Sequence, residues 1–338
     1  MTLPLIVTAI LVLGVVFVNG WTDAPNAIAT AVSTRALNIR AAVIMAAIMN
    51  LAGAFISTLT GAKVASTILN MVDFSSAPNL PKNAPQVALA ASLFAIVVWA
   101  VAAWYFGIPT SESHALIAGL SGSAISLGGM EAIKWDEWMK VIYGLVASVA
   151  IGFIGGLLIT KSLVLIFKNI ARRTANKFFT IGQICGAAAN AYLHGAQDGQ
   201  KFMGVFMLGL TLNGLANDGA PIPIWVIFMC AIVMGLGTSV GGEKIIKSVG
   251  MDMVKLEKYQ GFAADISTAI SIQAMTSLGV PVSTTHAKTT AIMGVAASRR
   301  MSSIDWSVVK EMVMAWILTF PGCGLIAYLM SKFFVMIF

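Results

Sequence analysis

The sequence predicts an all-α polytopic membrane protein, and three observations lead to this prediction. Of the 338 residues, 58% are hydrophobic and only 10% are charged, against about 25% charged in a soluble domain. The mean hydropathy is +0.87. The apolar residues form long continuous runs, which favour spanning helices over the alternating strands of a membrane barrel. This composition excludes a soluble enzyme, a disordered chain and a small disulfide-stapled domain.

The apolar runs predict about 10–12 membrane segments, given that a spanning helix needs about 20 residues. Most runs are uniformly apolar, whereas two begin with clustered hydroxyl residues. The uniform runs cover about 4–18, 41–61, 87–107, 141–167, 181–193, 203–214, 222–241, 262–278 and 307–337, and the other two cover about 109–128 and 281–297.

The formal net charge of +7 does not indicate nucleic-acid binding. The positive residues lie in short connections between apolar runs, where the positive-inside rule of membrane proteins expects them. The cysteines Cys185, Cys230 and Cys323 lie in apolar stretches without paired spacing. We therefore expect no nucleic-acid partner, and we expect the three cysteines to be buried free thiols.

Two halves of the chain carry the same motifs in the same order. The segment VNGWTDAPNA (18–27) resembles LHGAQDGQKF (193–202), and GIPTSESHA (107–115) resembles GVPVSTTHA (279–287). A tryptophan then precedes the last apolar run of each half, and the offset stays nearly constant at about 171–175 residues. The sequence therefore predicts a two-fold repeat. The first repeat covers 1–167, the connecting loop 168–180, and the second repeat 181–338.

Charges in matched connections predict that the two repeats have opposite orientations. Arg35 and Arg40 follow the first motif, whereas the matched segment 213–220 has no Lys or Arg. Other matched connections also differ in the sign or density of charge. Matched connections then face opposite sides of the membrane, which is the pattern of an inverted-topology repeat. This orientation makes the basic loop 168–180 cytoplasmic and both termini extracellular.

The first motif pair predicts a discontinuous helix with a cation site. Pro25 cannot donate a backbone hydrogen bond and Gly20 relaxes the backbone, so the helix should break here. Freed carbonyls beside Asp23 and Asn26 are oxygen ligands for a hard cation such as Na⁺. The repeat mate supplies Asp198 and a lysine three residues later. Lys201 could pair with Asp198 or contact an anion.

The second motif pair predicts two helix starts suited to an oxyanion. Each motif has a proline followed by clustered hydroxyls, which favours a capped helix N-terminus with free N–H groups. The alternative is that the hydroxyls only join packed helices. Each segment is short enough for a re-entrant hairpin. Glu112 would repel an anion, so it suits cation coordination or proton coupling better.

Further ionisable residues lie at membrane depth, where such groups are costly and usually functional. We expect coupling or gating roles for some of them, although Asp265 could equally be structural and Lys288 could approach the anion or reach the surface. The candidates for coupling or gating are His114, His194, His286, Lys201 and Asp265.

These motif pairs resemble the two signatures of the PiT family of inorganic phosphate transporters. In that family the first signature usually reads G-A-N-D-V-A-N-A and the second P-V-S-T-T-H. The resemblance covers almost the whole chain. It implies inverted repeats, re-entrant hairpins, Na⁺ or H⁺ coupling and often a dimer. The chain departs from the pattern at Trp21-Thr22, Gln197 and Glu112, which leaves the coupling ion open.

Carried over by position, the resemblance implies two sets of site residues. The implied phosphate ligands are Asn26, Thr110, Ser111, Ser113, Gln200, Ser283, Thr284 and Thr285. The expected Na⁺ ligands are Asp23, Asn26, Asp198, Gln197, Glu112, Ser111 and Ser283, of which Gln197 and Glu112 depart from the family pattern.

Together these features predict a secondary active symporter that imports inorganic phosphate with Na⁺ across the plasma membrane by alternating access. We expect the lipid bilayer, phosphate, Na⁺ and a second copy of the chain as partners, and no cofactor. The alternatives are an H⁺-coupled permease for phosphate, metal phosphate or sulfate, and a passive anion channel, which would need a lumen with permanent positive charge. A membrane enzyme is disfavoured, because no nucleophile motif or metal-ligand spacing is present.

Overall fold

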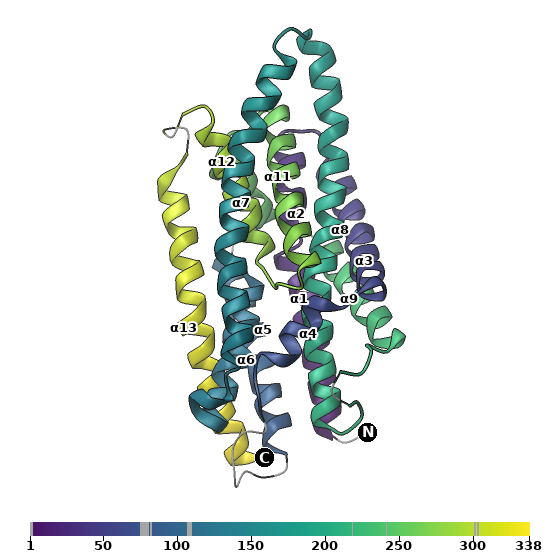
Figure 1. Cartoon of the computed structure of the whole chain (residues 1–338), viewed down its shortest axis with the longest axis vertical. Coiled ribbons are helices and arrows are strands. Elements are labelled where there is room, and N and C mark those ends of the chain that lie inside the picture. Colours follow the sequence, from purple (N-terminus) through teal and green to yellow (C-terminus); the bar gives the residue numbers. More distant parts are fainter. Residues whose placement is uncertain are drawn as a thin grey trace.

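The fold is an elongated bundle of helices, as the sequence predicts (Figure 1). The computed structural model describes residues 3–74, 81, 83–106, 110–217, 219–240, 242–300, 302 and 304–338. Within these ranges the regular structure is helical apart from one isolated bridge between Val72 and Ile133. The prediction of an all-α polytopic fold is therefore confirmed.

The turn at residues 168–171 divides the helices into two predicted halves. The first half contains α1 (Leu3–Thr22), α2 (Pro25–Ser33), α3 (Ile39–Thr60), α4 (Lys63–Asn70), α5 (Ala84–Phe106), α6 (Glu112–Gly128), the 3₁₀ turn η1 (Gly129–Ala132) and α7 (Trp135–Phe167). The second half contains α8 (Arg172–Leu212), α9 (Ile224–Val240), α10 (Glu243–Lys247), the π turn η2 (Ser248–Asp252), α11 (Lys258–Ser277), α12 (Thr284–Ala297) and α13 (Trp306–Ile337).

Six helical segments of the described chain are long and apolar enough to cross a membrane, or seven if α9 and the bent segment after it form one span. This number is below the expected count of segments partly because two of the four polar motifs lie on helices outside the six, α8 and α12. Helix α8 joins two expected runs into 41 residues and carries one motif, and α12 has only 14 residues. The six segments are Leu5–Ser33, Ile39–Thr60, Ala84–Phe106, Glu112–Ala132, Trp135–Phe167 and Trp306–Ile337.

Two helix pairs pack reciprocally on the long final helix of the opposite half. The pair α5 and α6 packs against α13, and the pair α11 and α12 packs against α7. The pair α11 and α12 occupies the upper part of the bundle, and α5 and α6 occupy the lower part (Figure 1). This reciprocal packing agrees with the predicted repeat. The opposite orientations of the two repeats in the bilayer stay a prediction.

Glycines allow α12 to pack closely against α7, and α6 against α13. A Cβ atom added at Gly294 of α12 would lie 1.9 Å from the carbonyl oxygen of Phe153 on α7. A Cβ added at Gly122 of α6 would lie 2.1 Å from the carbonyl oxygen of Gly324 on α13. Small residues at such crossings are typical of membrane helices, whose association depends on close packing.

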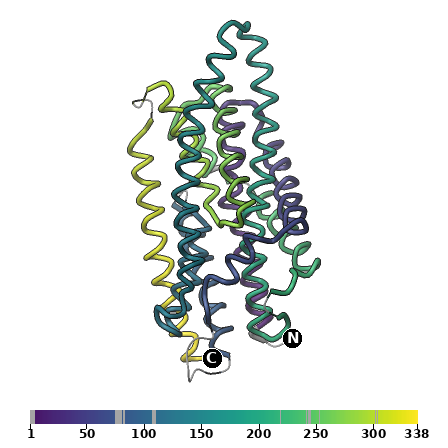
Figure 2. The backbone as a smooth tube through the Cα atoms, viewed as in Figure 1, coloured from purple at the N-terminus to yellow at the C-terminus, as the bar shows by residue number. Residues whose placement is uncertain are grey.

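The two chain ends lie at one end of the bundle, and the turn between α7 and α8 lies at the other (Figure 2). Helix α8 begins at Arg172, so only 168–171 of the expected loop 168–180 connects the two long helices. The thiols of Cys230 and Cys323 are buried as expected. The expectation was wrong for Cys185, which is exposed, because it lies on an outward face of α8.

We expect Gly294→Ala to destabilise the protein by about 1–3 kcal/mol, the usual cost of overpacking. The new methyl group would overlap the Phe153 carbonyl, so α7 and α12 would have to separate. Thermal unfolding of the purified protein in detergent measures the effect. Gly14→Ala is the matched control, because nothing lies within 4 Å of a Cβ at that position. Equal melting temperatures for both variants would contradict the proposed close contact.

Candidate ion and anion site

The break between α1 and α2 places Asp23 inside the bundle. Helix α1 ends at Thr22 and α2 begins at Pro25, as the motif predicts. Pro25 has no N–H group, so it cannot donate to the carbonyl of Trp21, four residues earlier. The Asp23 N–H donates to the Asn19 carbonyl at 2.9 Å, and the Asp23 side chain is buried. The matched motif has no such break, because α8 is continuous through it.

Two aspartates and a histidine from the first motif pair meet in a buried cluster. One ligand atom from each of Asp23, His194 and Asp198 lies within 4.8 Å of the others. Asn19 Nδ2 donates to Asp198 Oδ2 at 3.2 Å, and His194 Nε2 lies 3.3 Å from the same oxygen. His194 Nδ1 lies 2.8 Å from Asn50 Oδ1. The tertiary fold thus unites motifs from both halves.

Several oxygens of this cluster are buried without a hydrogen-bond partner among the described residues. They are Asn19 Oδ1, Asp23 Oδ2 and Asn26 Oδ1. Buried polar atoms normally have a partner, and carboxylate and amide oxygens are ligands that hard cations prefer. The residues around Asp23 therefore fit a small cation such as Na⁺.

Helix α12 brings hydroxyl groups to the same carboxylate. The Thr285 hydroxyl donates to Asp23, and Asn26 Nδ2 lies 2.9 Å from the Thr285 hydroxyl and 2.8 Å from Asp23 Oδ1. Ser283 caps the helix, because its side chain accepts from the His286 N–H at 3.2 Å. The Thr284 hydroxyl is buried without a partner among the described residues.

Helix α6 begins in the same way and meets α12 in the middle of the bundle. Ser111 accepts from the His114 N–H at 3.2 Å, and half-buried Thr110 precedes it. Ser113 Oγ donates to the Val282 carbonyl, just before α12, at 3.2 Å. Glu112 Oε1 accepts from the Thr22 hydroxyl at 2.7 Å. The two predicted helix starts are therefore together, although Pro109 lies outside the described residues.

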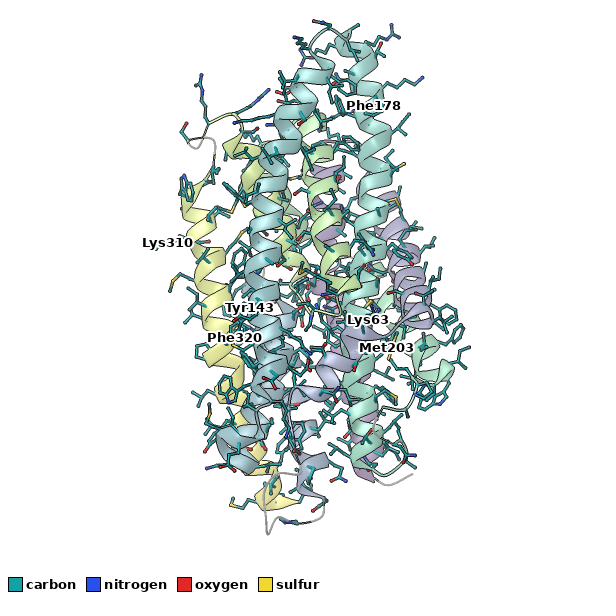
Figure 3. The ribbon with its side chains drawn as sticks, in the orientation of Figure 1. Lys63, Tyr143, Phe178, Met203, Lys310 and Phe320 are labelled. Carbon is teal, nitrogen blue, oxygen red and sulfur yellow. The ribbon has the colours of Figure 1, made fainter. Side chains whose placement is uncertain are left out.

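Two of the three motif histidines lie among aromatic rings. The rings of His114 and His286 are 4.3 Å apart and perpendicular. His114 also packs 4.5 Å from the Phe320 ring and His286 3.7 Å from the Trp316 ring. Figure 3 labels Phe320 on α13. These two histidines thus join the starts of α6 and α12 to α13, whereas His194 contacts one of the aspartates.

Both buried lysines form ion pairs. Lys201 Nζ lies 2.5 Å from Asp198 Oδ1, so of the two predicted alternatives the structure has the ion pair. Lys288 is fully buried, donates to Asp265, and lies 3.0 Å from the Thr30 hydroxyl. That hydroxyl in turn donates to Asp265 Oδ1 at 2.6 Å. Lys288 therefore does not extend to the surface.

Two predicted ligands are hydrogen-bonded to neighbouring segments instead. The Gln197 amide donates to the Val280 carbonyl at 2.9 Å and accepts from the Thr276 hydroxyl at 2.7 Å. The Gln200 amide accepts from the Val64 N–H at 3.0 Å and donates to Ser57 at 2.7 Å.

In this conformation both amides hold α8 against adjoining elements. Figure 3 labels Lys63 of α4 and Met203 of α8, two helices that pack together.

Two site residues, Asn50 and Thr30, lie outside the four motifs. The signal that could have identified them is weak, because each is one polar residue within an apolar or small-residue stretch. Asn50 contacts His194 at 2.8 Å, and Thr30 contacts Asp265 at 2.6 Å. Sequence spacing gave no reason to connect either residue with its partner.

A small cavity borders the anion-binding candidates. Its polar lining includes Asn26, His194, Thr284 and Lys288. Its volume of about 10 Å³ is roughly what one water molecule needs. The structure is therefore closed tightly around this region, and a tetrahedral oxyanion would require the helix starts to separate.

Buried acids, helix starts and a broken helix inside an apolar bundle are typical of a secondary transporter. The family model described as "Phosphate transporter family" matches residues 19–327. The chain therefore belongs to the phosphate transporter family, and the predictions of the family and of a transporter rather than an enzyme are confirmed.

Curated relatives and a solved structure agree with this assignment. A probable low-affinity inorganic phosphate transporter of Bacillus subtilis is 42% identical over 316 residues, covering 92% of each chain. Its counterpart in Rhizobium meliloti is 38% identical over 315 residues, covering 93% of this chain and 91% of that one. A solved structure described as "The sodium-dependent phosphate transporter" covers 100% of both chains with a TM-score of 0.84 and 22% identity, and thus has the same fold.

We expect Lys288→Met to destabilise the protein strongly. The substitution leaves the Asp265 carboxylate buried without its ammonium partner, which costs about 3–5 kcal/mol. Thermal unfolding in detergent measures this loss. The double variant Lys288→Met/Asp265→Asn removes both charges, so we expect it to recover most of the stability. A double variant no more stable than Lys288→Met would contradict the assigned ion pair.

Proposed function

We propose that this chain imports inorganic phosphate together with Na⁺, as a secondary active symporter of the plasma membrane. The contact between Asp23 and Thr285 carries the proposal. In this contact, a proposed Na⁺ ligand, Asp23, touches a proposed phosphate ligand, Thr285. Membership of the phosphate transporter family supports the substrate, and the sodium-dependent phosphate transporter of the same fold supports Na⁺.

In this proposal Na⁺ binds beside Asp23. Among the described residues, Asp23 Oδ2 and the side-chain oxygens of Asn19 and Asn26 are buried without hydrogen-bond partners, and the Asp198 carboxylate lies nearby. A cation bound there lowers the repulsion between these carboxylates and an incoming phosphate. Cation and phosphate therefore favour each other's binding, which is the energetic basis of symport.

Phosphate binds between the two helix starts. Their N–H groups and hydroxyls are neutral donors, and a helix N-terminus favours an anion. Thr284 supports this assignment most directly, since its hydroxyl lacks a partner among the described residues and borders the cavity next to Lys288. The proposed donors are Thr110, Ser111, Ser113, Ser283, Thr284 and Thr285.

Alternating access requires the starts of α6 and α12 to separate. The phosphate site would then open first to one side of the membrane and afterwards to the other. The reciprocal packing of α5 and α6 on α13, and of α11 and α12 on α7, supports two repeat-related moving units. The small cavity, of about 10 Å³, has no room for phosphate in this conformation, so phosphate entry requires such a separation. We retain the homodimer as a prediction from the family resemblance.

Uptake of radiolabelled phosphate into proteoliposomes tests the proposal. We expect accumulation above equilibrium with an inward Na⁺ gradient, because Na⁺ entry supplies the free energy. Arsenate, which has the same tetrahedral shape and charge, should compete, and sulfate should not. Accumulation only with an H⁺ gradient would contradict Na⁺ coupling, and block by sulfate would contradict the substrate. No accumulation under either gradient would contradict symport.

In the same assay, a matched pair of α12 variants tests the site. Thr285→Val removes the hydroxyl that contacts Asp23, and a hydrogen bond to a charged group is worth about 1.5–3 kcal/mol. We therefore expect Na⁺ activation of uptake to weaken by about ten- to a hundredfold. Thr289→Val removes a buried hydroxyl without a partner among the described residues and should retain Na⁺ activation. Equal activation in both variants would contradict the Asp23 site.

Cysteine labelling tests the proposed orientation, with loop 168–180 cytoplasmic and both termini extracellular. In a Cys185→Ala background, exposed Asn176→Cys lies near the α7–α8 turn, and Leu215→Cys follows the opposite end of α8. A membrane-impermeant maleimide should label Leu215→Cys on intact cells, because that end faces outward. Asn176→Cys should react only after permeabilisation. The reverse pattern would contradict the orientation.

A further inference from the structure

We propose that the Lys201 ammonium is a tethered cation that fills the second of two repeat-related cation positions. The chain would then bind one mobile Na⁺ fewer than it would with a neutral residue at this position. The inference rests on the proposed cation-coupled function and specifies how many ions that function uses.

The internal repeat defines the two positions. Asp23 and Asp198 occupy matching places in the first motif pair, and the third residue after each is Asn26 or Lys201. Each of these residues directs a nitrogen to its own aspartate. Asn26 Nδ2 lies 2.8 Å from Asp23 Oδ1, and Lys201 Nζ lies 2.5 Å from Asp198 Oδ1. The same position thus holds a neutral amide in one half and an ammonium in the other.

The surroundings of Lys201 Nζ are those of a bound cation. Three oxygens lie 2.5 Å from it, namely Asp198 Oδ1, Ser113 Oγ and the Val282 carbonyl oxygen. They come from α8, from the start of α6 and from the connection between α11 and α12. A carboxylate, a hydroxyl and a backbone carbonyl freed by an interrupted helix are the ligands that transporters offer to Na⁺.

The ammonium uses all its hydrogen-bonding capacity in this position. A lysine side chain has three N–H donors, and three oxygens surround Nζ. The side chain is 0% exposed. Lys201 therefore has no donor left for phosphate in this conformation, which argues against a direct anion contact.

The position beside Asp23 is different. Asp23 Oδ2 and Asn26 Oδ1 are buried without partners among the described residues. Both contacts that the Asp23 carboxylate receives, from Asn26 and Thr285, come from neutral groups. Asp198, by contrast, has its countercharge within the chain. Of the two repeat-related carboxylates, only Asp23 therefore requires a mobile cation.

The test measures the number of Na⁺ ions that bind to the protein, and it does not require a transport assay. The melting temperature of the full-length purified protein is measured against Na⁺ concentration, with choline replacing Na⁺ to hold ionic strength constant. The dependence on the logarithm of concentration gives the number of Na⁺ ions bound to the folded state. We expect Lys201→Asn, which copies Asn26, to bind one Na⁺ more than the wild type.

Two controls separate this effect from a general loss of a buried charge. The double variant Asp198→Asn/Lys201→Asn lacks the carboxylate as well, so it should bind no additional Na⁺. The double variant Lys288→Asn/Asp265→Asn removes a buried ion pair outside the first motif pair without leaving a carboxylate unpaired, and it should also gain none. A gain in either control would overturn the proposal.

Asn26→Lys provides a second and opposite test if Lys201→Asn does not fold. It places an ammonium in the first position, so the folded protein should lose the Na⁺ dependence of the wild type. An unchanged Na⁺ count in a folded Lys201→Asn variant, or a retained count in Asn26→Lys, would overturn the proposal. A different result would separate the two proposals. If Lys201→Asn binds one more Na⁺ but the wild type accumulates no phosphate, the proposed function is refuted and the tethered cation is supported.

Discussion

The cost of a charge inside a membrane is the constraint on which this structure depends. An ionised carboxylate that loses its partner in a buried site costs several kcal/mol, so each buried acid needs a compensating group. Lys201 compensates Asp198, and Lys288 compensates Asp265. Among the described residues, the hydrogen bonds to the Asp23 carboxylate come from the neutral side chains of Asn26 and Thr285. This difference among three buried aspartates is what makes Asp23 the natural place for an exchangeable cation.

The surrounding helices hold that arrangement together. The break at Pro25 turns Asp23 and Asn26 toward the centre, and capped starts of α6 and α12 bring hydroxyls from both halves to the same region. Close approach requires small residues at the crossings, such as Gly122 and Gly294. The polar centre therefore depends on the close-packed helix crossings, because displacing α12 from α7 would also displace Thr285 from Asp23.

The two halves are alike in architecture but not in chemistry. Their helices pack reciprocally, yet only the first motif is interrupted by a proline, whereas α8 continues through its mate. A continuous helix keeps its carbonyls in internal hydrogen bonds, so the second position relies on Ser113 and the Val282 carbonyl instead. In our proposal, this asymmetry allows the first half to exchange an ion while Lys201 provides a fixed charge in the second.

The membrane fold, the family, the order of the repeated motifs and the identity of most polar residues at the centre could all be predicted from the sequence. These follow from local properties, namely long apolar runs, the proline after Asp23 and the serine caps before His114 and His286. Which side chains contact one another could not be predicted in this way and became clear from the fold. Gln197 and Gln200 point to neighbouring segments, and Asn50 joins His194 from a run with no motif. Lys201 pairs with Asp198 while also contacting two other elements. Such contacts depend on how helices far apart in sequence cross, and helical spacing along one segment carries no information about that.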